Sequence, residues 1–138
     1  MNLPHKPGDP DYLLRRVLQA NAAFSTLCGL VWIAGGEGLG TWFGREGSMA
    51  ADGAGLLVFA ALLVVLCARA KIPPLLAAVV VALDVLWVVD AGTRIASGTF
   101  STQGSWIMGL IALAVLDFAA FQALGVYWAG QTRRAGGV

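Results

Sequence analysis

Four long runs of apolar residues, separated by short polar segments, dominate the pattern of the chain. They cover residues 17–34, 53–70, 74–91 and 106–129. Each run is continuously apolar rather than alternating with period two, which is typical of a helix in lipid and not of a membrane strand. A helix needs roughly 20 apolar residues to cross the hydrocarbon core. The pattern therefore predicts an all-α fold, a single membrane domain over residues 1–138 with four transmembrane helices in an antiparallel bundle.

The connecting segments refine this picture. The first, residues 35–52, is rich in glycine, and we expect Leu39, Trp42 and Phe43 to lie flat on the membrane surface as a short interfacial turn. The second, residues 69–74, is very short, and its two prolines prevent the flanking runs from merging into one helix. We therefore expect the second and third helices to pack directly against each other.

Two local motifs stand near the ends of the first run. Asp9 followed by Pro10 predicts an N-cap and the first helical position, so the first helix is expected to begin there. Gly36 and Gly40 have the GxxxG spacing of helix-dimer interfaces. They lie at the end of a span among charged residues, so a simple helix end is the preferred interpretation.

Composition excludes an ordinary soluble domain. Hydrophobic residue types make up 58% of the chain and charged residues 12%, with a mean hydropathy of +0.76, whereas soluble domains carry about 25% charged residues. The formal net charge of +1 provides no global field for nucleic acid. A cleaved signal peptide is the alternative interpretation of the first run, but that run is longer than a usual signal core.

The residues that build most catalytic or metal sites are scarce. The single histidine, His5, lies in the polar N-terminal tail, so no span carries a histidine and a membrane cytochrome of the bis-histidine kind is excluded. Cys28 and Cys67 lie inside apolar runs without CxxC spacing, which argues against a disulfide framework or a zinc site. The spans contain no Ser–His, histidine-rich or Cys–Cys arrangement. We therefore expect no catalytic residues, no metal, no cofactor and no enzymatic activity.

The basic residues predict the orientation of the helices. With a cytoplasmic N-terminus, two of the nine Lys and Arg residues face outward, Arg45 and Arg94. The other seven face the cytoplasm: Lys6, Arg15, Arg16, Arg69, Lys71, Arg133 and Arg134. This is a strong positive-inside bias for short loops. It predicts that both termini, tails 1–12 and 130–138, are cytoplasmic.

Polar residues within the spans are the most informative feature for function. Asp84 and Asp117 each lie about ten residues into their span, near mid-bilayer at 1.5 Å per residue. Because an isolated charge there costs several kcal/mol, each should face the bundle interior and be protonated or hydrogen-bonded. Helical spacing predicts an intramembrane polar network, either structural or proton-handling, formed by Asn21, Ser25, Asp84, Trp87, Asp117 and Gln122.

Resemblances to known families are loose. Residues 99–102 (Thr-Phe-Ser-Thr) resemble part of the fluoride-channel signature but lie in a loop, and small multidrug-resistance transporters carry a glutamate in span one where this chain has Asn21 and Ser25. The stretches Leu14–Ser25 and Ala82–Trp87 are similar to small, uncharacterised bacterial four-span integral membrane proteins. That resemblance implies a multi-pass protein of the bacterial cytoplasmic (inner) membrane and no known activity.

Two functional classes remain open. Small size and short loops favour an accessory or scaffolding subunit that acts through intramembrane helix contacts, with the lipid bilayer and either a homo-oligomer or a larger membrane complex as its partners. The alternative is a homo-oligomeric channel or proton-coupled transporter using Asp84 and Asp117. The two classes differ in their assembly: a transporter should form a defined homo-oligomer, whereas an accessory subunit should co-purify with a different protein.

Overall fold

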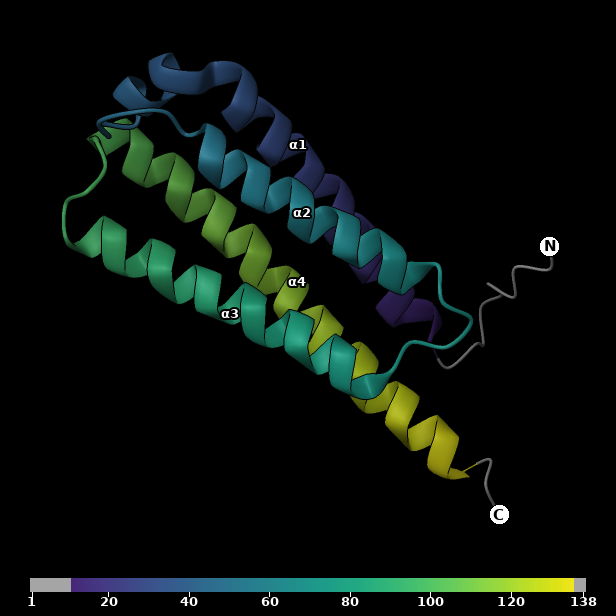
Figure 1. The fold of residues 1–138 in the computed structure, drawn as a ribbon. Helices are drawn as coiled ribbons and strands as arrows, with labels where there is room; N and C mark the ends of the chain where they lie inside the picture. The colour runs from purple at the N-terminus through teal and green to yellow at the C-terminus, as the bar shows by residue number, and fades with distance from the viewer. Residues whose placement is uncertain (1–10, 136–138) are drawn as a thin grey trace.

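The computed structural model describes residues 11–135 and consists of four helices, with no strand in that part of the chain. They are α1 (Tyr12–Trp42), α2 (Ala50–Cys67), α3 (Pro74–Ala96) and α4 (Thr102–Ala135), which lie alongside one another in Figure 1. All four are long and apolar enough to cross a membrane. The predicted all-α fold with four helices of spanning length is therefore confirmed.

Proline and glycine set two helix limits close to the predicted positions. Pro73 has an extended backbone with a ψ of 127°, so α3 begins at Pro74. Helical geometry in α1 breaks at Gly36, whose φ of +49° lies in the region that favours glycine. The predicted helix start at Asp9 and Pro10 lies outside the described residues.

The connections at one end of the bundle, here called the Phe43 end, are joined to each other. After Gly36 the chain continues as a short helical segment, and Phe43 is buried at 2% exposure instead of lying flat on the surface as expected. Its ring packs edge-on against Phe100 at 6.1 Å, and its carbonyl accepts a hydrogen bond from the Ser101 amide at 2.7 Å. The prediction of a surface position was wrong for Phe43 because these contacts from the α3–α4 connection cover it, whereas Trp42 is exposed.

The opposite end, here called the Arg15 end, is held by the side chains of Arg15 in α1 and of Asp11, the residue before this helix. Arg15 is buried at 3% exposure. Its guanidinium donates to backbone carbonyls at the end of α2 and in the following connection: those of Cys67, Arg69 and Ala70. The Asp11 carboxylate accepts a hydrogen bond from the Ile72 amide at 3.1 Å. Arg15 thus supplies donors for carbonyls that a helix end leaves without partners.

The helices pack as two pairs, α1 with α2 and α3 with α4, and α1 also packs against α4. No Cα atom of α2 lies within 8 Å of one in α3. The expectation that these two helices pack directly against each other was therefore wrong. The short connection joins them only at the Arg15 end, and Figure 1 shows α4 behind the space between them.

Glycines permit the close approach of α1 to α2. A Cβ atom added to Gly29 would lie 2.8 Å from the Gly53 carbonyl oxygen, and one added to Gly53 would lie 2.6 Å from the Gly29 oxygen. The GxxxG pair is used differently, because Gly36 forms the break in α1 and Gly40 packs against the Gly47 carbonyl of the same chain. Both glycines lie within α1, which continues to Trp42 beyond the break at Gly36.

Candidate functional site: a polar layer and its cavity

A layer of buried polar side chains lies between the two apolar clusters of the core, one around Leu18 and Leu63 and the other around Trp32 and Met108. Asn21 and Ser25 are one turn apart on α1, and Asp84 faces them from α3. The Nδ2 of Asn21 donates to Oδ2 of Asp84 at 2.8 Å, and the Ser25 hydroxyl donates to Oδ1 of Asn21 at 3.2 Å. All three side chains are at most 4% exposed. The predicted network is thus present for these three residues.

Gln122 of α4 completes the layer from the other side of Asp84. It is fully buried, at 0% exposure, and its amide lies next to the Asp84 carboxyl. Neither amide atom of Gln122 has a hydrogen bond of ordinary geometry to a described residue. A buried amide with unused donors and acceptors is costly. The Gln122 amide is therefore a hydrogen-bond donor and acceptor without a partner of ordinary geometry among the described residues, beside the Asp84 carboxyl.

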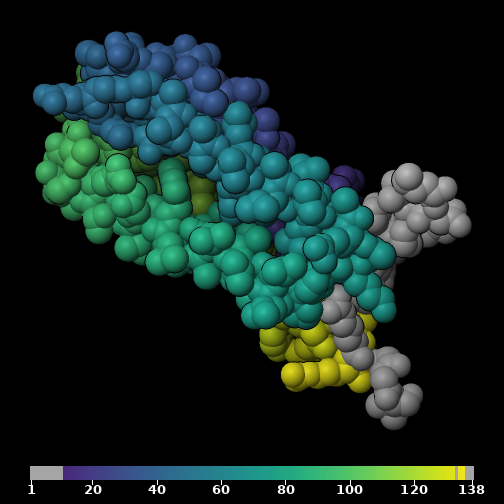
Figure 2. All heavy atoms as spheres, viewed as in Figure 1, coloured from purple at the N-terminus to yellow at the C-terminus, as the bar shows by residue number. Residues whose placement is uncertain are grey.

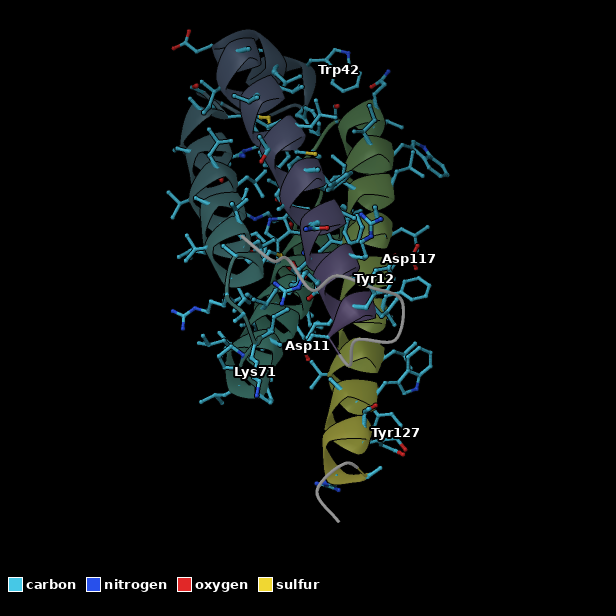
Figure 3. All side chains as sticks on the ribbon, turned by 90° about the vertical axis from the view of Figure 1, so that its right-hand side faces the viewer. Asp11, Tyr12, Trp42, Lys71, Asp117 and Tyr127 are labelled. Carbon is cyan, nitrogen blue, oxygen red and sulfur yellow. The ribbon has the colours of Figure 1, made fainter. Side chains whose placement is uncertain are left out.

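Asp117 does not belong to the layer. It is exposed on α4, and in Figure 3 its side chain points away from the other helices. The inward face of this helix is marked by Phe118, whose ring lies edge-on to that of Phe24 at 5.6 Å, and by buried Gln122. Five residues correspond to a rotation of about 140° around a helix. Asp117 and Gln122 therefore cannot both face the interior, and the structure places Gln122 there.

Trp87 lies about one turn beyond Asp84 on α3 and is half-buried. The described part of the chain provides no hydrogen bond to its indole. It forms instead, with Trp32, an aromatic wall of a cavity of about 400 Å³. Ser25 and Asp84 also line this cavity. Trp87 was predicted to belong to the polar network, but in the structure it forms part of the cavity wall.

The cavity lies between α2 and α3, where the two helix pairs do not touch. Figure 2 shows a hollow between these helices, with atoms of α4 visible inside it. Side chains from all four helices line it, including Phe24, Leu56, Asp84 and Ile111. Because no backbone of α2 approaches α3, this is the side on which the bundle is least closed.

Two aspartates in the half of the bundle towards the Phe43 end form ion pairs. Asp52 lines the cavity and pairs with Arg45 at 2.6 Å, while Asp90 pairs with Arg94 at 2.8 Å on the surface of α3. Among the described residues, Asp84 has no basic side chain paired with it, and its carboxylate accepts a hydrogen bond from the Asn21 amide. The cavity therefore has one carboxyl with a basic partner and one without.

Among the described residues, no three or more His, Cys, Asp or Glu side chains gather in a way that could hold a metal ion. A comparison of the chain with protein-family models, curated proteins and solved structures found no match. Functional proposals therefore rest on the geometry of the polar layer, the cavity and Asp117.

Proposed function

We propose that the chain is a multi-pass protein of the bacterial cytoplasmic membrane, an antiparallel bundle with both termini in the cytoplasm. Arg15, Arg69 and Lys71 lie together at one end, which supports a cytoplasmic Arg15 end. Arg45 and Arg94, the two basic residues assigned to the outer side, are both paired with aspartates. These ion pairs lower the net positive charge at the outer end and so strengthen the difference in basic charge between the two ends of the bundle.

Within that membrane we propose a non-catalytic role as an accessory or scaffolding subunit that docks through α4. The observation that carries this role is Asp117, a carboxyl exposed at mid-span. Its exposed neighbours on the helix are apolar, namely Leu113, Leu116, Ala120 and Phe121. A charged aspartate at that depth costs about 2.5–3.5 kcal/mol in lipid. A partner helix that supplies a hydrogen-bond donor removes most of that cost.

The partner proposed is a helix of another membrane protein that carries a basic or amide side chain at mid-bilayer depth. The exposed side chains in the middle of α1, α2 and α3 offer no such group; they are Ala23, Leu27, Val58, Ala61, Leu62, Ala82, Leu83, Val85 and Leu86. A second copy of this chain brings to the contact only its own Asp117. This favours a foreign subunit over a homo-oligomer as the main partner.

Affinity purification from native membranes, followed by native mass spectrometry, tests this proposal. We expect a stoichiometric foreign membrane protein with the wild-type chain and at least a severalfold loss of it with Asp117→Leu, because interhelical hydrogen bonds contribute about 0.6–2 kcal/mol. Asp117→Asn should retain an amide-bearing partner and lose a basic one. Asp90→Asn, which changes an exposed aspartate in the last two turns of α3, is the matched control and should not change recovery.

Two outcomes contradict the proposal. If the same partner is recovered with Asp117→Leu, the partner does not dock on the Asp117 face of α4. A homo-oligomer without a foreign subunit, dissociated by Asp117→Leu, replaces the accessory role with self-assembly.

A channel or proton-coupled transporter is the second candidate, and the cavity that reaches Asp84 supports it. Asp84 is buried inside the bundle, whereas Asp117 is exposed on the outer face of α4. A pathway through the cavity therefore uses Asp84 within one chain and Asp117 only at a contact between chains. In proteoliposomes, this candidate predicts proton flux that Asp84→Asn abolishes. Absence of flux from the wild-type chain argues against it.

A further inference from the structure

The geometry points to the cavity between α2 and α3 as a binding site for a lipophilic organic cation, held by the Asp84 carboxyl and the indoles of Trp32 and Trp87. This site lies away from the proposed docking face on α4. It depends on neither a partner protein nor transport.

The size and lining of the cavity suit a small amphipathic molecule. Its volume of about 400 Å³ lies within the roughly 300–1,000 Å³ typical of ligand pockets. The walls are mostly apolar, with Phe24 and Phe59 in addition to the two tryptophans. Polar groups are few, which is the usual composition of a site that orients a ligand by one or two contacts.

The charge of the ligand follows from the lining. Asp84 and Asp52 line the cavity, and no Lys, Arg or His does. Asp52 is already paired with Arg45, whereas Asp84 receives its one hydrogen bond of ordinary geometry at Oδ2, from Asn21. Oδ1 accepts no hydrogen bond of ordinary geometry from a described residue. An anion would meet the Asp84 carboxyl with no basic side chain in the lining, so a cation is the complementary species.

Aromatic faces next to a carboxyl are the usual surroundings of a bound organic cation, because the ring quadrupole attracts positive charge. Trp87 lies about one turn from Asp84 on α3 and lines the same cavity. A cation on Asp84 therefore has an indole at the next turn of the same helix. An apolar body attached to that cation would fill the space towards Trp32 and Phe59.

The polar layer behind the cavity is built to hold the carboxyl in place. Asn21 fixes one oxygen, Ser25 fixes Asn21, and Gln122 lies beside the carboxyl on the α4 side. These are positioning residues, because Asn21 and Gln122 do not line the cavity. They orient Asp84 without blocking it.

Binding is tested on the purified chain in a neutral detergent by equilibrium dialysis. The probe is methyltriphenylphosphonium, and triphenylphosphine oxide is its uncharged analogue of nearly the same shape. We expect the cation to bind at least tenfold more tightly than the oxide. Asp84→Asn, which keeps an amide oxygen for Asn21, should weaken cation binding at least tenfold and leave binding of the oxide unchanged. Trp87→Leu should weaken cation binding severalfold.

A second variant keeps the test valid if Asp84→Asn fails to fold. Gly55 lines the cavity, and a Cβ atom built on it meets nothing within 4 Å. Gly55→Phe should therefore fill the cavity mouth, leave the polar layer intact and abolish binding of both probes. Asp117→Asn, which changes a carboxyl outside the cavity, is the control and should bind as the wild type does.

Three results overturn the inference. Equal affinity for the two probes shows an apolar site without charge recognition. Retention of cation binding in both Asp84→Asn and Gly55→Phe places the cation elsewhere. If Asp117→Asn weakens cation binding as much as Asp84→Asn does, binding depends on the total negative charge of the protein and not on the cavity.

Discussion

Arg15 is a buried cation whose hydrogen-bond partners are backbone carbonyls. Its neighbour Arg16 is exposed, with its guanidinium over the ring of Tyr12 at 5.7 Å. The two arginines are adjacent in sequence and have the same charge, but only Arg15 reaches the end of α2. Its contribution to stability is therefore that of a helix cap, and it depends on the planar fork of the guanidinium.

We expect Arg15→Ala to lower the free energy of unfolding by about 3 kcal/mol, because hydrogen bonds to a charged group contribute about 1.5–3 kcal/mol each and the carbonyls lose their donors. Arg15→Lys should recover only part of this loss. The measurement is reversible unfolding in mixed micelles by denaturing-detergent titration. Arg16→Ala is the control and should change stability by less than about 0.5 kcal/mol. Equal effects of the two alanine variants would show that charge, and not capping, matters here.

At the scale of the helices, the contact between α1 and α2 depends on two glycines facing each other. Neither Gly29 nor Gly53 tolerates a Cβ atom without movement of the opposite backbone. Gly55 is on the same helix as Gly53 but has open space where its Cβ would be. The same substitution should therefore have opposite effects at two positions of α2 that are two residues apart.

Gly53→Ala should destabilise the fold by about 1–3 kcal/mol, the usual cost of overpacking. Gly55→Ala should be neutral or stabilise it by up to about 1 kcal/mol, because alanine favours a helix over glycine. Thermal unfolding of the two variants in the same detergent provides the comparison. If Gly53→Ala is as stable as the wild type, the close α1–α2 approach is not a requirement of the fold.

At the scale of the whole molecule, the bundle is two helix pairs joined along α1 and α4. The α2–α3 connection also joins the pairs at the Arg15 end, where Asp11 and Arg15 hold it. At the Phe43 end, the Ser101 hydroxyl donates to the Trp42 carbonyl at 2.8 Å. The two ends are thus tied across the pairs, and the space between α2 and α3 lies between these ties.

The proposed orientation places the two ends on opposite sides of the membrane. In a background with Cys28→Ala and Cys67→Ala, we expect Thr99→Cys, in the exposed α3–α4 connection, to react with a membrane-impermeant maleimide from the periplasm. Ala70→Cys, in the exposed α2–α3 connection, should react only after the inner membrane is permeabilised. The reverse pattern would invert the topology.

Hydropathy along the chain was sufficient to predict four helices, and the two prolines were sufficient to predict the start of α3 at Pro74. The first span was predicted to end at residue 34, whereas α1 breaks at Gly36 and continues to Trp42. Hydropathy reports depth in the membrane but not which face of a helix points inward. Asp117 was therefore assigned to the interior on depth alone, although its spacing from Gln122 excludes that both residues face inward. The burial of Arg15 depends on carbonyls more than 50 residues away, which no local pattern encodes.

The open space between α2 and α3, here called the seam, determines how a bound molecule (the guest) would reach Asp84. In a bilayer the seam faces acyl chains rather than water, so the guest would first dissolve in the leaflet and then move sideways into the bundle. Its effective concentration is then set by its partition coefficient. Each additional methylene improves partitioning by about 0.8 kcal/mol, roughly fourfold. Among cations of equal charge, apparent affinity measured from water would rise with chain length until the apolar body exceeds the cavity.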